Sequence, residues 1–156
     1  VIPTDWPLAI NALVSVGQPH TTRYMTDFFG YVERARTAKT TYDRALEMQI
    51  EPDAALAVLG RDAAFIGAHD MIVSEMEEAV AIISTIKTIE MESFGAYTGA
   101  QKREAIEALQ KLMHQKIRYT TMLLYDIEQA GEDIERQHRD VIRKAQKSFR
   151  ELGGSQ

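Results

Sequence analysis

Residues 106–152 read IEALQKLMHQKIRYTTMLLYDIEQAGEDIERQHRDVIRKAQKSFREL, and apolar or small residues recur through this stretch at steps of three or four. The recurring positions are Ile106, Leu109, Met113, Ile117, Thr120, Leu124, Ile127, Ala130, Ile134, His138, Val141, Ala145, Phe149 and Leu152. A mean step of about 3.5 residues keeps a hydrophobic line facing a partner helix along a left-handed supercoil. We therefore predict one unbroken helix over residues 98–152, about 80 Å long at 1.5 Å per residue.

Two features within this predicted helix bear on its limits. Thr98 followed by Gln101 has the form of a capping box, which places the start of the helix at this point. Gly131 lies in the interior, where glycine costs about 1 kcal/mol relative to alanine. Because the hydrophobic line keeps its phase on both sides of Gly131, the pattern favours one continuous helix over two helices joined by a loop.

Two more helices are predicted before this one. Aromatic and aliphatic residues at helical spacing indicate a helix over residues 21–50, which ends before Pro52. The next predicted helix covers residues 53–94, and its apolar face is broad enough to contact two neighbours. Glycines and small residues between 93 and 99 predict the turn into the last helix.

These elements predict an all-α fold, an elongated antiparallel three-helix bundle with coiled-coil-like packing. Residues 1–20 form a short N-terminal arm or lid in this prediction, residues 21–152 form the bundle, and residues 153–156 form a flexible tail. If the turn is centred between residues 96 and 97, residue i of the second helix is level with residue 193 − i of the third. This register predicts four pairs of opposite charge: Glu90 with Arg103, Glu77 with Lys116, Glu75 with Arg118, and Arg61 with Glu132.

The composition limits the classes of function. A hydrophobic fraction of 45% and a charged fraction of 26% are typical of a folded chain, and the net charge of −5 disfavours sequence-specific nucleic-acid binding. The absence of cysteine excludes disulfides and thiolate metal sites. The apolar run over residues 8–16 is too short to span a bilayer, so we predict no transmembrane segment. The chain begins at Val1, and we favour an exported mature chain over an intracellular fragment.

Motifs for catalysis are weak. Glu135 and His138 form the Glu-x-x-His spacing of carboxylate-bridged di-metal bundles, but the second copy that such a site requires is missing. His69 and Asp70 are adjacent, and adjacent helical residues point about 100° apart, so we expect no catalytic pair there. The sequence holds no nucleophile elbow, P-loop or dinucleotide fingerprint. We therefore predict no enzymatic activity, no metal site and no cofactor.

Three groups of residues are candidates for contact with a partner. The first is an apolar strip in the N-terminal arm, which docks either on its own bundle or on another subunit. The second is a pair of aromatic residues on the first helix that are hard to bury together with their neighbours. The third is a basic face near the C-terminus, which either complements the helix dipole or contacts an acidic partner or an anionic surface. In that order, the groups are Trp6, Ile10, Leu13 and Val14; Phe29 and Tyr31; and Arg136, Arg139, Arg143 and Lys147.

Two functions remain open on this evidence. The first is a non-enzymatic helical interaction protein, a subunit or adaptor of a larger assembly that acts through helix-surface contacts, with an exported, envelope or secretion role as the favoured setting. A protein partner or self-association is expected in that case. The second is a helical sensor or carrier that binds a small apolar ligand in its core, where the seven methionines would lend plasticity.

Overall fold

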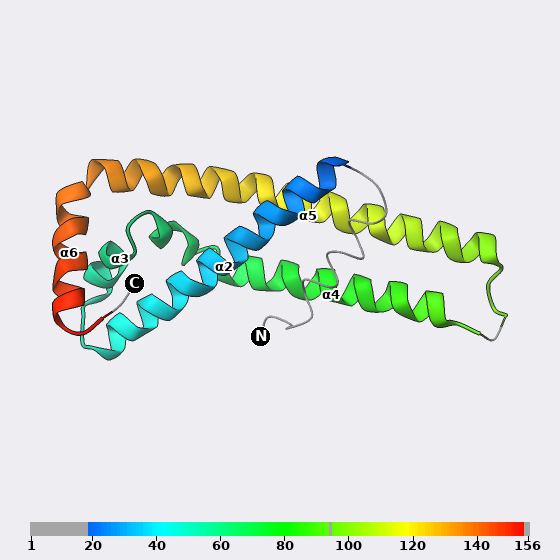
Figure 1. Ribbon diagram of the computed structural model, residues 1–156, viewed down its shortest axis with the longest axis horizontal. Coiled ribbons are helices and arrows are strands. Elements are labelled where there is room, and N and C mark those ends of the chain that lie inside the picture. Colours follow the sequence, from blue (N-terminus) through cyan, green and yellow to red (C-terminus); the bar gives the residue numbers. More distant parts are fainter. Residues whose placement is uncertain (1–18, 94, 155–156) are drawn as a thin grey trace. The chain divides into compact units, whose positions relative to one another are not determined.

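The computed structural model describes residues 19–93 and 95–154, and Figure 1 shows a molecule built of helices. Helices cover 87% of the described residues, and no strand occurs among them, so the predicted all-α class is confirmed. The elements are α2 (Pro19–Glu47), α3 (Pro52–Leu59), the 3-10 helix η1 (Gly60–Phe65), α4 (His69–Met91), α5 (Gly99–Gln137) and α6 (Arg139–Glu151). They form two compact units, one containing residues 19–28 and 73–121 and the other containing residues 29–72 and 122–154.

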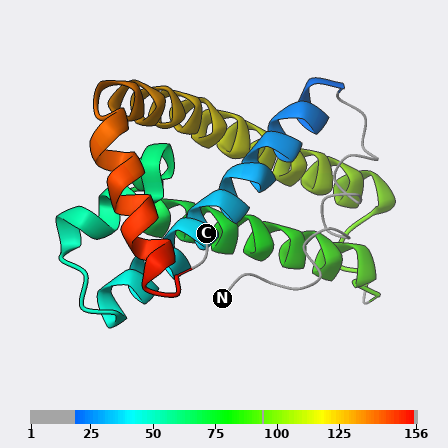
Figure 2. The ribbon, with the colours of Figure 1, turned by 60° about the vertical axis from the view of Figure 1, so that its left-hand side comes forward.

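The first unit contains an antiparallel hairpin of α4 and the first part of α5, which lie side by side in both Figure 1 and Figure 2. Its buried side chains come from both helices and from the start of α2: Met25, Phe28, Met76, Ala79, Ile83, Ile86, Met113 and Ile117. The predicted capping box is present. The Gln101 amide donates to Thr98 Oγ1 over 3.1 Å, and the Thr98 amide donates to Gln101 Oε1 over 2.8 Å.

The charge register of this hairpin differs from the prediction by one residue. Lys116 pairs with Glu78 in place of Glu77, and Lys102 pairs with Glu92 over 3.6 Å. Both pairs fit a register in which residue i is level with residue 194 − i. Of the four predicted pairs, the one between Arg61 and Glu132 is present in the second unit, at 3.3 Å.

The predicted helix over residues 53–94 is wrong, because the chain forms α3, η1 and α4 in its place. The break begins at Gly60, which has φ +61°, a backbone conformation that residues with a Cβ rarely adopt. The 3-10 helix that follows buries Phe65 in the core of the second unit. It also brings the carbonyl oxygen of Arg61 so close to α5 that a Cβ on Gly131 would lie 2.2 Å from it.

The predicted continuous helix over residues 98–152 is also wrong, although the break is not at Gly131. Gly131 lies inside α5, which ends at Gln137, and His138 has φ −120° and ψ 29° before α6 begins. Figure 1 shows α6 running in a direction different from the end of α5. After the break, Ile142 and Phe149 are buried, whereas Val141 and Leu152 are 61% and 60% exposed. Ile134, which lies before the break in α5, is 52% exposed.

Candidate interaction surface

The inner face of α6 is fixed against α3. Phe149 lies in a buried cluster with Ala45, Ala55 and Val58. The Gln146 side-chain amide donates to the carbonyl oxygen of Val58 over 3.3 Å. These contacts determine which side chains of α6 face away from the second unit.

The chain after α6 turns back and caps the helix. The Gly154 amide donates to the carbonyl oxygen of Phe149 over 2.9 Å, and a Cβ on Gly154 would lie 2.5 Å from the Phe149 ring. Arg44, at the end of α2, donates to the carbonyl oxygen of Gly153 over 3.2 Å. The end of α6 is therefore held from two sides, and its outer residues are presented by a fixed helix.

The outer face of α6 carries a row of bases at steps of three or four residues, all of them exposed: Arg139, Arg143, Lys147 and Arg150. Lys147 lies 4.0 Å from Glu151, and Arg136, in the last turn of α5, pairs with Asp133. Neither Arg143 nor Arg150 forms an ion pair with another described residue. The structure therefore brings Arg139, Arg143 and Lys147 of the predicted basic face onto one helix and places Arg136 on another.

Two exposed apolar residues, Val141 and Leu152, lie on another side of α6. Ala145 and Ser148 lie between them at steps of four, three and four; Ala145 is half-buried against the cluster that contains Phe149, and Ser148 is exposed. Val141 and Leu152 were predicted to lie in the hydrophobic line of an uninterrupted helix. The strong separation of apolar and charged residues over residues 139–151 is the signal that could have revealed which face of α6 is buried.

In the Glu-x-x-His pair, Glu135 forms hydrogen bonds that join η1 to α5. Glu135 accepts the Arg61 backbone amide at 2.8 Å and the Arg61 guanidinium at 3.0 Å, and these hydrogen bonds lower the pKa of the Glu135 carboxyl. His138 is exposed at the break between α5 and α6. Within residues 19–93 and 95–154, no group of three or more His, Cys, Asp or Glu residues is placed to hold a metal ion.

His69 and Asp70, which were expected to form no catalytic pair, lie within hydrogen-bond distance of each other. His69 Nδ1 is 3.2 Å from Asp70 Oδ1 at the start of α4. The Asp70 carboxylate is fully exposed, so the pair lies on the surface.

The prediction that Tyr31 is left outside the core is wrong, because its side chain is only 6% exposed. Its hydroxyl donates to Glu128 Oε1 over 3.0 Å, and its ring lies 5.6 Å from the Phe65 ring and 5.9 Å from the Tyr125 ring. Burial and the hydrogen bond to Glu128 raise the pKa of Tyr31. Phe29 is half-buried. The strip of Trp6, Ile10, Leu13 and Val14 lies outside the described residues.

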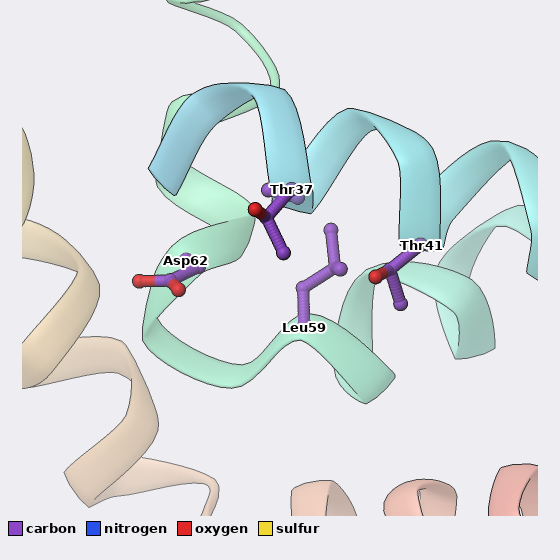
Figure 3. Close-up of a pocket in the computed structure, with 5 residues that line it drawn as sticks. Thr37, Thr41, Leu59 and Asp62 are labelled. Atoms are coloured by element: carbon purple, nitrogen blue, oxygen red, sulfur yellow. The ribbon is translucent and has the colours of Figure 1, made fainter. Parts of the chain in front are cut away.

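A small hollow of about 160 Å³ opens between α2 and the start of η1. Figure 3 shows Thr37 and Thr41 of α2 facing Leu59, with Asp62 at one side. The guanidinium of Arg34 donates to Asp62 Oδ1 over 2.7 Å. The hollow has room for about five water molecules at roughly 30 Å³ each, and its lining mixes hydroxyl and carboxylate groups with aliphatic carbon.

No helix among the described residues combines the length and the apolar character needed to cross a membrane. Comparison of the chain with protein-family models, with curated proteins and with solved structures gives no match. The function is therefore argued from the geometry of the chain itself.

Proposed function

We propose that the chain is a non-enzymatic helical interaction protein, and that the outer face of α6 binds an acidic segment of a protein partner. The row of exposed bases on α6, together with the exposed Val141 and Leu152 on another side of the same helix, carries this proposal. Coiled-coil-like packing of the helices is part of the same proposal.

The position of the break at His138 weakens the explanation of the bases by helix dipoles. A dipole favours bases only in the last turn of a helix, which accounts for Arg150 in α6 and for Arg136 in α5. Arg139 follows the negative end of α5 by two residues, and its charge helps to lower the pKa of Glu135. Arg143 lies in the second turn of α6 and Lys147 before its last turn, so a function outside the helix is the better explanation for these two bases.

The chemistry of α6 favours a protein partner over a nucleic acid or a membrane. A phosphate backbone needs only the bases, whereas Val141 and Leu152 offer apolar contacts that a partner helix would bury. Arginine is enriched in protein interfaces because its guanidinium binds carboxylates through two hydrogen bonds. The net charge of −5 for the whole chain also opposes attraction to nucleic acid.

A peptide titration tests this proposal. The probe is a labelled synthetic amphipathic helix with leucines at steps of three and four and glutamates on both flanks, and its control is a scrambled peptide of the same composition. We expect the amphipathic peptide to bind at least about tenfold more tightly than the scrambled one. Arg143→Glu should weaken binding of both peptides, and Val141→Asp should remove the preference for the amphipathic peptide.

The matched control variant is Arg36→Glu, which makes the same charge change at an exposed position on α2. Equal binding by wild type and Arg143→Glu, with Arg36→Glu also unchanged, would refute the assignment to α6. Equal binding of the amphipathic and scrambled peptides would mean that only charge is recognised, which would favour a nucleic acid or an anionic surface.

The alternative function, a carrier of a small apolar ligand, has less support. The hollow beside α2 is lined by Thr37, Thr41 and Asp62 as well as by Ala38 and Leu59. Hydroxyl and carboxylate groups lose hydrogen bonds to water when an apolar molecule covers them, so this hollow suits a polar occupant better than an apolar one.

A further inference from the structure

A second line of residues, exposed except for the half-buried Ala105, runs along α5 in the first unit, away from the buried Met113 and Ile117. Its large apolar members are Leu112 and Tyr119, which are 47% and 66% exposed. The full line advances by steps of four, three, four, three and four residues through Gln101, Ala105, Ala108, Leu112, Gln115 and Tyr119. Steps of this kind place side chains along one helix face where a second helix can pack.

The charges beside this line distinguish between the two directions in which a second α5 could pack. Glu104, Lys111 and Arg118 follow one another at seven-residue steps along one edge. In a parallel pair, Glu104 and Arg118 of one copy would face Leu109 and Leu123 of the other, so neither would form an ion pair along this edge. In an antiparallel pair, Glu104 of each copy lies next to Arg118 of the other copy, which forms two equivalent ion pairs around a two-fold axis.

We propose that this line of α5 is a self-association face on which α5 of a second copy packs antiparallel. The axis passes near residue 110, so that residue i faces about residue 220 − i of the other copy. This register places Leu112 against Ala108 twice. It also places Tyr119 against Gln101 of the other copy.

The bases on the other edge of the line do not oppose this arrangement. Lys102 and Lys116 of opposite copies come near each other in this register, but each is already paired within its own copy. Lys102 lies 3.6 Å from Glu92, and Lys116 pairs with Glu78. The remaining like-charge contact is between the two copies of Lys111 at the axis. Lys111→Ala should therefore strengthen the association.

Disulfide formation tests the antiparallel register, because the chain contains no cysteine. The variants Ala108→Cys and Leu112→Cys are purified with different tags and oxidised separately and together. We expect the mixture to form a cross-linked heterodimer at least about tenfold faster than either variant cross-links with itself. Ser84→Cys, at an exposed position on α4, is the control for random collision. If each variant cross-links with itself faster than the two variants cross-link with each other, the pair is parallel and the proposal is wrong. If neither cross-links faster than the Ser84→Cys control, the proposal is also overturned.

Sedimentation velocity over a range of concentrations tests the ion pairs. We expect wild type to associate into a dimer, and Glu104→Arg and Arg118→Glu each to weaken the dimer about tenfold or more. Arg118 also lies over the Tyr24 ring in its own copy, so the double exchange Glu104→Arg, Arg118→Glu is the decisive variant. It should restore the dimer, whereas Glu107→Arg should change association little. A wild-type monomer at all concentrations, or a double variant no better than the single ones, would overturn the proposal.

Discussion

Gly131→Ala is expected to destabilise the protein, although alanine is the better helix former. Gly131 lies inside α5, and a Cβ there would lie 2.2 Å from the Arg61 carbonyl oxygen and 3.3 Å from Ala64 Cβ. A separation of 2.2 Å is far inside van der Waals contact, so η1 has to move away from α5. Such overpacking costs about 1–3 kcal/mol. The same movement strains the hydrogen bonds from Arg61 to Glu135.

The helix propensity gained by replacing glycine with alanine offsets about 1 kcal/mol of this cost. The expected net loss in the free energy of unfolding is about 0–2 kcal/mol, or a decrease in Tm of up to roughly 8 °C for a chain of this length. Thermal and urea unfolding followed by circular dichroism measure it. Gly30→Ala is the matched control, because Gly30 lies in the same unit within a helix and has no atom within 4 Å of the added Cβ. It should stabilise the protein by about 0.4–1 kcal/mol. A Gly131→Ala variant as stable as Gly30→Ala would refute the close packing of η1 on α5.

Three further predictions concern single hydrogen bonds. Arg61 lowers the pKa of Glu135, so the charged carboxylate adds stability above its unfolded pKa near 4.5, and this contribution is lost as pH falls through the folded pKa. Glu135→Gln should therefore make the free energy of unfolding depend less steeply on pH in the acid range. An unchanged pH dependence would contradict this. Tyr31→Phe removes the hydrogen bond to Glu128 and should lower the free energy of unfolding by about 0.5–1.5 kcal/mol in urea titrations, whereas no loss would mean that the hydroxyl is unpaired in solution. Thr98→Ala should cost about 1 kcal/mol, and Thr98→Ser should retain most of that stability, since a serine hydroxyl also caps the helix.

Local features were predictable from the sequence, because they depend on neighbouring residues. The capping box at Thr98 and Gln101 is an example, since two side chains and two backbone amides complete it. The pairing of α4 with α5 was predictable to within one residue from the position of the turn, with the charges as a check. The continuity of the helix through Gly131 was also predictable from the unbroken phase of the hydrophobic line.

The breaks in the helices were not predictable, because tertiary contacts cause them. Steps of three and four continue through His138, so periodicity gives no sign of the turn into α6. The turn buries Ile142 and Phe149 against α3, and this gain depends on residues nearly 90 positions earlier in the chain. Burial of Tyr31 likewise depends on Glu128, which lies 97 residues away and accepts its hydroxyl.

Thiol labelling at two adjacent positions of α6 tests the central claim most directly, because the proposed interaction surface depends on which face of α6 points outward. Val141→Cys and Ile142→Cys each introduce the single thiol of a chain that otherwise has none. With Val141 61% exposed and Ile142 7% exposed, the Cys introduced at position 141 should react with a maleimide at nearly the rate of the unfolded chain. The Cys introduced at position 142 should react at least about a hundredfold more slowly, since it has to wait for local opening. Slow labelling at 141 with fast labelling at 142 would mean that the hydrophobic line continues uninterrupted through His138, and it would contradict the account.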